Sequence, residues 1–168
     1  MSIKVGEKVP YDITLWKAVQ PLPEDGACPI PTKVQSNTLF EGKKVVLVAV
    51  PGAFTPTCSV KHIPGFVEKI DEIKAKGIDA VYCIAVNDGF VMSYWAADQK
   101  AGDKVQFFGD GNGDFTKKIG LTKDCTAFGL GIRSERYAIV IHDGIVKSIA
   151  VDAGAFGETS VEAVLAKL

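Results

Sequence analysis

Residues 50–66 read Val-Pro-Gly-Ala-Phe-Thr-Pro-Thr-Cys-Ser-Val-Lys-His-Ile-Pro-Gly-Phe, and this segment contains the strongest structural signals in the chain. The run before it, residues 43–50, is apolar after two lysines, as in strands that are buried on both faces, and a Pro-Gly pair ends it. Thr55 is a good N-cap, and Pro56 suits the first helical position because proline has no N–H to leave unpaired there. The stretch therefore predicts a strand, a tight loop and a helix that carries Cys58 in its first turn.

The predicted position of Cys58 has a chemical consequence. N–H groups of a first helical turn point out of the helix end and carry partial positive charge, so they favour a thiolate over a thiol. A less basic thiolate is also a weaker nucleophile, and fast chemistry therefore needs groups that stabilise the leaving atom. The loop offers the Thr55 hydroxyl and the backbone N–H groups from Gly52 to Cys58. We expect this site to accept a small, polarisable electrophile.

The motif Pro-Gly-Ala-Phe-Thr-Pro-Thr-Cys at residues 51–58, continued by His62 and by Pro-Gly-Phe at 64–66, resembles the active-site signature of peroxiredoxins. The similarity is to the type II branch, also called five-type. Residues 84–91 (Ile-Ala-Val-Asn-Asp-Gly-Phe-Val) and 129–137 (Gly-Leu-Gly-Ile-Arg-Ser-Glu-Arg-Tyr) resemble the same branch. The resemblance therefore covers roughly the whole chain.

This resemblance implies a thioredoxin-like α/β fold, in which helices cover both faces of a central mixed sheet. It also implies an enzyme that reduces hydrogen peroxide and alkyl hydroperoxides through a sulfenic acid at Cys58, in antioxidant defence and without a cofactor. Pro51 would shield the sulfur, while Thr55, Arg136 and the Cys58 N–H would hold the two peroxide oxygens.

Composition limits the alternatives. A chain of 168 residues with 47% apolar and 23% charged residues predicts one globular domain over residues 1–168. A net charge of −1 gives no support for binding nucleic acid. We expect no membrane span and no signal peptide, and hence a cytoplasmic protein. Four cysteines are few for a disulfide scaffold, and two histidines without a Cys-x-x-Cys pair argue against a metal site.

Other parts of the chain give coarser predictions. Alternation predicts an edge strand over 11–19, and four prolines predict a loop over 21–31. Strands are expected at 78–86 and 104–108, with helices from Pro56 to about residue 77 and over about 88–100, and the first helix is expected to be kinked at Pro64. Segments 136–142 and 145–151 flank Asp-Gly, a strong hairpin signal. We expect Asp114 to cap a short helix at 115–119, and Thr159 with Glu162 to form a capping box for the last helix.

Two arginines compete for the role of fixed cation at the thiol. Arg136 opens a predicted strand, which places its guanidinium at the end of the sheet, where it could stabilise a thiolate and polarise a peroxide oxygen. The family resemblance assigns that role to Arg136. Arg133, three residues earlier, would take it if the alignment of this loop were shifted.

His62 lies four residues after Cys58 and so on the same helical face. That spacing is compatible with a cysteine hydrolase in which imidazole takes the thiol proton. No Asp or Asn that would orient such an imidazole is identifiable. We therefore favour a supporting role, in which His62 forms a hydrogen bond that ties the helix to a neighbouring loop.

Residues 110–114, Asp-Gly-Asn-Gly-Asp, imitate the start of a calcium loop but lack its sixth-position glycine and its closing glutamate. The glycines at 109, 111 and 113 lack the third glycine of a dinucleotide-binding pattern. Both are interpreted as turns. The function that competes with a peroxidase is a thioredoxin-fold binding or holdase protein with an inert thiol.

Three cysteines could in principle react with a Cys58 sulfenic acid. Cys83 matches the position of a second cysteine in plant-like members, although a central strand is rigid. Cys28 resembles an extra N-terminal cysteine of some fungal members, and Cys125 is expected in an exposed segment. We favour reduction by an external thiol, glutathione with glutaredoxin or else thioredoxin, with Cys28 and then Cys83 as alternative resolving residues.

Assembly is predicted only from family analogy. Type II peroxiredoxins are often dimers that form across the loops around the active site. In this chain, a homodimer would use Phe54, Phe128, Gly129 and Gly131.

Overall fold

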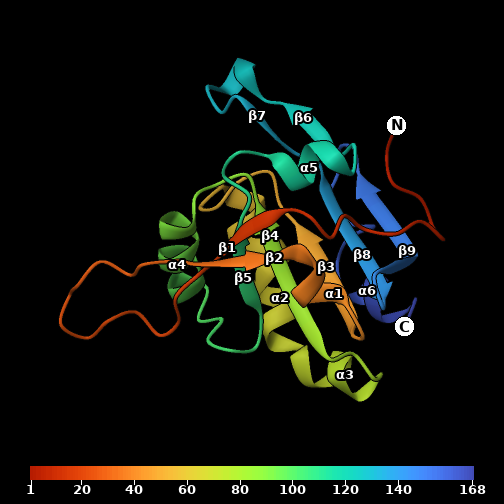
Figure 1. Cartoon of the computed structure of the whole chain (residues 1–168), viewed down its shortest axis with the longest axis horizontal. Coiled ribbons are helices and arrows are strands. Elements are labelled where there is room, and N and C mark those ends of the chain that lie inside the picture. Colours follow the sequence, from red (N-terminus) through yellow and green to blue (C-terminus); the bar gives the residue numbers. More distant parts are fainter.

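The computed structural model describes residues 1–168 and centres on a seven-stranded mixed sheet (Figure 1). Three parallel strands and one antiparallel neighbour form its middle, and the outer strands pair antiparallel. Across the sheet the strands are β2 (Thr32–Gln35), β1 (Thr14–Lys17), β5 (Gln106–Gly109), β4 (Ala80–Ala85), β3 (Lys44–Ala49), β8 (Arg136–His142) and β9 (Ile145–Asp152). The predicted strand before the Cys58 loop is therefore β3, beside the second predicted apolar strand, β4.

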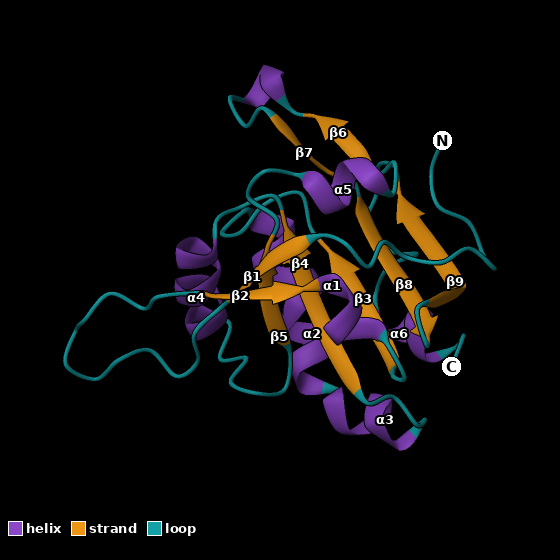
Figure 2. Cartoon of the chain, in the orientation of Figure 1, coloured by secondary structure: helices purple, strands orange, loops and turns teal.

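Helices cover both faces of this sheet, as Figure 2 shows. One face packs against α2 (Ile63–Glu68), α3 (Ile70–Ala75), α4 (Gly89–Asp98) and α6 (Val161–Leu165). The other packs against α1 (Ser36–Phe40), α5 (Asp114–Lys118) and the N-terminal segment. Because successive strand residues point to opposite faces, β3 supplies Val46 and Val48 to the first core and Val45 and Leu47 to the second. The predicted thioredoxin-like α/β fold is confirmed.

The β8–β9 hairpin is confirmed at its predicted turn. Asp143 and Gly144 connect the strands with φ angles of 48° and 74°, as a type I′ turn requires. The predicted helix at 88–100 is also confirmed as α4, where the Asp88 carboxylate accepts the N–H of Val91. The stretch 21–31 contains no helix or strand, as predicted.

Three local predictions are wrong. The segment 11–19 contains β1, but β1 is an inner strand because the short, polar β2 pairs along its outer side. The N–H groups at the start of α5 are held by the buried Asp110 carboxylate and not by Asp114. Ser160 caps α6 by accepting the N–H of Ala163, since the Thr159 hydroxyl donates elsewhere.

A second, two-stranded sheet was not predicted. It pairs β6 (Thr122–Asp124) with β7 (Ile132–Ser134), and a short 3-10 turn, η2 (Thr126–Phe128), lies between them. This hairpin projects from the main body at the top of Figure 1. Cys125, the first residue of the loop that connects the two strands, is buried, which corrects the expectation of an exposed segment, and its N–H donates to the Gly131 carbonyl.

None of the helices has the length and apolar character needed to cross a lipid bilayer.

Candidate active site

Cys58 lies just after the β3 loop, in the first turn of the helical segment that begins at Pro56. Its side chain is fully buried. The predicted continuous helix is irregular: residues Cys58–His62 form a π-helical turn, η1, in which the Ile63 N–H donates to the Cys58 carbonyl. The irregularity expected at the internal proline therefore takes the form of a widened turn just before it, and a second break at Lys69 separates α2 from α3. π-Helical turns within helices are frequent at functional sites.

Arg136 is the cation that faces the thiol. Its Nη2 lies 3.3 Å from Cys58 Sγ, and its Nη1 lies 3.0 Å from His62 Nδ1. Arg136 is the first residue of β8, so the sheet brings the guanidinium to the helix end, as the sequence predicted. The planar fork thus contacts the sulfur and the imidazole at the same time.

His62 is buried, and both of its ring nitrogens are engaged. Arginine can only donate, so Nδ1 must accept from Arg136, and Nε2 must carry the proton that it donates to the Thr159 carbonyl 3.0 Å away. Burial and then the charge of Arg136 lower the pKa of His62 from 6.5 to about 4. His62 is therefore a neutral imidazole at neutral pH. It has no lone pair free to take the Cys58 proton, and its contact with Thr159 is the predicted helix-to-loop hydrogen bond.

The loop before Cys58 is shaped by Thr55 and Gly52. The Thr55 hydroxyl donates to the Gly52 carbonyl over 2.7 Å, and the Thr55 carbonyl accepts the Ser59 N–H, the first helical bond. Thr55 is therefore at the N-cap position, but its hydroxyl does not cap the helix. Its oxygen lone pairs are left free to accept a hydrogen bond, and the Cys58 N–H donates to no group of the protein.

Arg133 supports the same loop from the outside. Its Nη1 lies 3.4 Å from both the Pro51 carbonyl and Asn87 Oδ1, and its Nε donates to the Leu130 carbonyl. Asn87 Oδ1 also accepts the Ala53 N–H over 3.0 Å. Of the two competing arginines, only Arg136 contacts the thiol, while Arg133 joins the β6–β7 hairpin to the loop.

The sequence reasoning missed Asp152, Phe156, Thr159 and Asn87. Asn87 lies within residues 84–91, which resemble type II peroxiredoxins, and this resemblance was the only indication in the sequence that Asn87 could belong to the site. The centroid of the Phe156 ring lies 5.1 Å from the centroid of the His62 ring and 5.9 Å from Cζ of Arg136. Thr159 was interpreted as a helix cap. Nothing in the local sequence indicates that residues 152–159 pack against His62, nearly one hundred positions earlier.

The other three cysteines differ in access. Cys83 lies on the central strand β4 and is fully buried, and burial, followed by the nearby Cys58, raises the pKa of its thiol well above the usual value. Cys125 is also buried, and only Cys28, in the proline-rich loop, is exposed. No disulfide is formed among the four.

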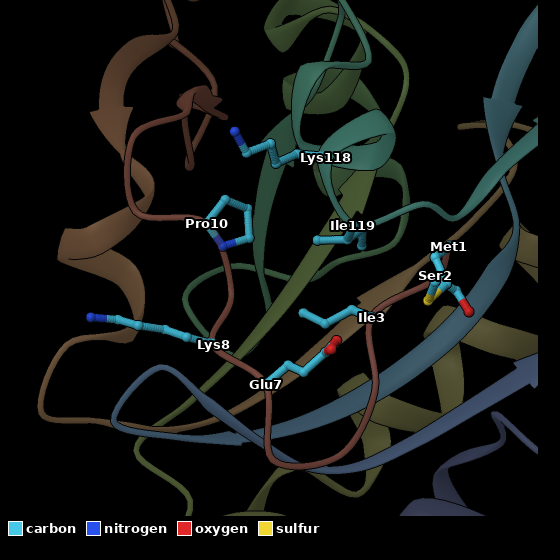
Figure 3. Close-up of a pocket in the computed structure, with 8 residues that line it drawn as sticks. All are labelled: Met1, Ser2, Ile3, Glu7, Lys8, Pro10, Lys118 and Ile119. Atoms are coloured by element: carbon cyan, nitrogen blue, oxygen red, sulfur yellow. The ribbon is translucent and has the colours of Figure 1, made fainter.

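A separate surface pocket lies between the N-terminal segment and the end of α5 (Figure 3). Its lining includes Glu7, Lys8 and Lys118 but no residue of the Cys58 site. The Glu7 carboxylate already accepts a hydrogen bond from the backbone N–H of Lys4. The pocket contains no cysteine and no group of side chains that could hold a metal ion.

Comparison with known proteins assigns the chain to a family. The Redoxin family model matches residues 4–165. The chloroplastic peroxiredoxin-2E of Arabidopsis thaliana is 48% identical over 170 residues, which cover 99% of this chain and 70% of that protein. Peroxiredoxin-2B of the same plant is 47% identical over 125 residues, covering 74% of this chain and 76% of the relative.

A solved structure extends the agreement to three dimensions. Reduced Prx3 of Vibrio vulnificus in complex with hydrogen peroxide superposes with a TM-score of 0.86 at 39% identity, over 98% of this chain and 94% of that one. The fold and the similarity to these relatives agree with the contact between the buried thiol and an arginine. We conclude that the chain belongs to the redoxin family, as a type II peroxiredoxin and thus a thiol-dependent peroxidase.

Proposed function

We propose that Cys58 is the residue that reacts with hydroperoxide, with Arg136, Thr55, Pro51 and the backbone of Gly52 and Cys58 completing the catalytic site. The observation that carries this proposal is the 3.3 Å contact between Arg136 Nη2 and Cys58 Sγ. A guanidinium fixed at that distance stabilises a thiolate and can also donate to a peroxide oxygen beside it.

The chemistry then follows from the donors and acceptors. The Cys58 thiolate attacks the terminal oxygen of the hydroperoxide, an S–O bond forms and the O–O bond breaks. Its electron pair goes to the departing oxygen, which takes a proton and leaves as water or an alcohol, and Cys58 becomes a sulfenic acid. The Thr55 hydroxyl donates to Gly52, so its oxygen accepts from the O–H of the peroxide. Arg136 and the unpaired Cys58 N–H donate to the oxygens as charge develops on them.

We further propose that an external thiol reduces the sulfenic acid, with glutathione and glutaredoxin, or thioredoxin, as the donor. Burial supports this proposal. Cys83 and Cys125 are both covered by the core, and Cys83 is held within a central strand, so neither can approach Cys58 without movement of the backbone. Cys28 is exposed, and a bridge from the partner copy of this residue is the alternative.

A homodimer and a cytoplasmic location complete the proposal, for a single domain over residues 1–168. Phe54 and Phe128 are 54% and 81% exposed, and Ile132 is 48% exposed, on the loop before Cys58 and on the adjoining hairpin. Exposed apolar groups of this kind favour an interface. Unpaired thiols fit a reducing compartment such as the cytoplasm.

The test is a single-turnover reaction. Reduced protein is mixed with one equivalent of hydrogen peroxide, and both peroxide loss and the mass of the Cys58 peptide are followed. We expect stoichiometric consumption with a sulfenic acid at Cys58, and neither in Cys58→Ser. Unchanged peroxide and an unmodified Cys58 would instead favour a binding or holdase protein with an inert thiol. Turnover with glutathione and glutaredoxin, compared with thioredoxin and its reductase, identifies the donor.

A further inference from the structure

The segment between β9 and α6 folds back on a single carboxylate. Asp152, the last residue of β9, is buried and accepts three backbone N–H groups, from Gly157, Glu158 and Thr159, over 2.9–3.3 Å. It also accepts the Thr159 hydroxyl over 2.6 Å. Burial raises the pKa of Asp152, but these hydrogen bonds outweigh it and the pKa is lowered. The carboxylate thus closes the loop 152–159 and fixes the orientation of the Thr159 backbone.

The carbonyl of Thr159 is the group through which this loop reaches the active site. It accepts from Nε2 of His62, which leaves the Nδ1 lone pair as the only acceptor that His62 can offer to Arg136. If the proton were on Nδ1, that nitrogen and the Arg136 Nη1 would both be donors 3.0 Å apart, and they would repel. The tautomer of His62 therefore decides whether Arg136 is held.

The hairpin register couples the two ends of this chain of contacts. Arg136 and Asp152 are direct cross-strand partners at the open end of the β8–β9 pair. Phe156, within the loop, packs against both the His62 ring and the Arg136 guanidinium. The loop thus contacts the arginine from one side while its backbone holds the histidine on the other.

We propose that Asp152 is a positioning residue for peroxide reduction: it fixes the Thr159 carbonyl, which sets the His62 tautomer, which orients the Arg136 fork on Cys58. This inference rests on the proposed function, because it concerns how that site is held in its reactive geometry. Asp152 touches neither the sulfur nor the substrate and acts only through the three residues between them.

The first test is spectroscopic and needs no activity. Nitrogen NMR of protein labelled at histidine shows which imidazole nitrogen carries the proton, and the chain has only one other histidine, His142, as an internal reference. We expect His62 in the wild type to be neutral with its proton on Nε2 throughout about pH 6–8. A proton on Nδ1, or a mixture of the two tautomers, would overturn the proposal.

The second test is kinetic. Asp152→Asn replaces one acceptor oxygen with a donor, so it should lower the rate constant for sulfenate formation by roughly 10- to 100-fold, the scale expected when a catalytic group shifts by about 1 Å. The same variant should show a mixture of His62 tautomers, and Asp152→Glu should recover part of both effects. Asp71→Asn, which removes a carboxylate from the exposed side of α3, is the matched control and should behave as the wild type.

The outcomes separate the two proposals. If Asp152→Asn keeps both the wild-type rate and the wild-type His62 signals, the positioning role is excluded while the function of Cys58 stands. If Asp152→Asn does not fold, Thr159→Val, which removes only the shortest contact to the carboxylate, should show the same changes to a smaller degree, and their absence would overturn the inference. Failure of the wild type to form a sulfenic acid would instead reject the proposed function.

Discussion

Replacing Arg136 by Lys keeps the positive charge and tests whether the shape of the guanidinium matters. In the structure one guanidinium reaches two groups, with Nη1 3.0 Å from His62 Nδ1 and Nη2 3.3 Å from Cys58 Sγ. A lysine ammonium is a single point on a flexible stem, so it can satisfy one of these partners but cannot be held by the other. Loss of one preorganised donor costs about 10²–10³-fold in rate, or about 2.7–4 kcal/mol. We expect Arg136→Lys to react with hydrogen peroxide more slowly by that factor.

The assay is stopped-flow mixing of the reduced protein with hydrogen peroxide, with alkylation by iodoacetamide as the comparison. Alkylation needs the thiolate but not the alignment of two oxygens, so it should fall much less than the peroxide reaction. The circular dichroism spectrum should not change.

Arg133→Lys is the informative neighbour. The Arg133 guanidinium contacts the Pro51 carbonyl and the Asn87 side chain and not the sulfur, so Arg133→Lys should lower the peroxide rate less than Arg136→Lys does. If Arg136→Lys keeps most of its peroxide rate, or if Arg133→Lys is the slower variant, the assignment of Arg136 is wrong.

Three further predictions concern resolution, pH and assembly. Cys28→Ser, Cys83→Ser and Cys125→Ser should each retain sulfenate formation and turnover with an external thiol; a variant that forms the sulfenate but no longer turns over would identify a resolving cysteine. The pKa of His62 is lowered from 6.5 to about 4 in the folded protein. Between these two pH values His62 is protonated in the unfolded chain but not in the folded protein, so the free energy of unfolding decreases as the pH falls from about 6.5 towards about 4. Urea unfolding should therefore show the wild type losing about 1.5 kcal/mol relative to His62→Gln between about pH 6.5 and 5, and parallel curves would contradict the burial of a neutral imidazole. Phe128→Asp should shift the proposed dimer towards monomer in light scattering, and a wild type that is monomeric at high concentration in both redox states would reject the dimer.

Local signals were sufficient for the parts of the site that are contiguous in sequence. The apolar run before residue 50 predicted β3, and the Pro-Gly pair and Thr-Pro step placed Cys58 at a helix start. Arg136 could be placed at the end of the sheet because the Asp-Gly turn at 143–144 marks the hairpin that it opens. These features rest on backbone preferences of a few adjacent residues, which sequence displays directly.

What sequence did not reveal depends on burial and on contacts between distant segments. The strands β2, β6 and β7 have three or four residues with several polar side chains, too few for an alternation to be recognised. At α5, Asp110 precedes the helix and Asp114 is its first residue, and only the packing of Asp110 into the core makes it the one that accepts the N–H groups. Threonine is a common helix-capping residue, but the Thr159 hydroxyl donates to the buried carboxylate of Asp152, seven residues earlier.

Part of the long-range geometry of the site comes from the β8–β9 hairpin. The Asp-Gly turn starts the pairing of β8 with β9, and a β-bulge between Val140 and Ile141 then shifts the register by one residue, so that Arg136 lies opposite Asp152. A slip by one residue would reverse the faces of every side chain in β9, turning Asp152 away from the loop that holds His62. Because Arg136 contacts both Cys58 and His62, the turn and the bulge together determine whether Arg136 and Asp152 meet at the open end of the hairpin. The geometry of the candidate site therefore depends on strand register, which explains how residues 58, 62, 136 and 152 can come together although no short motif contains them all.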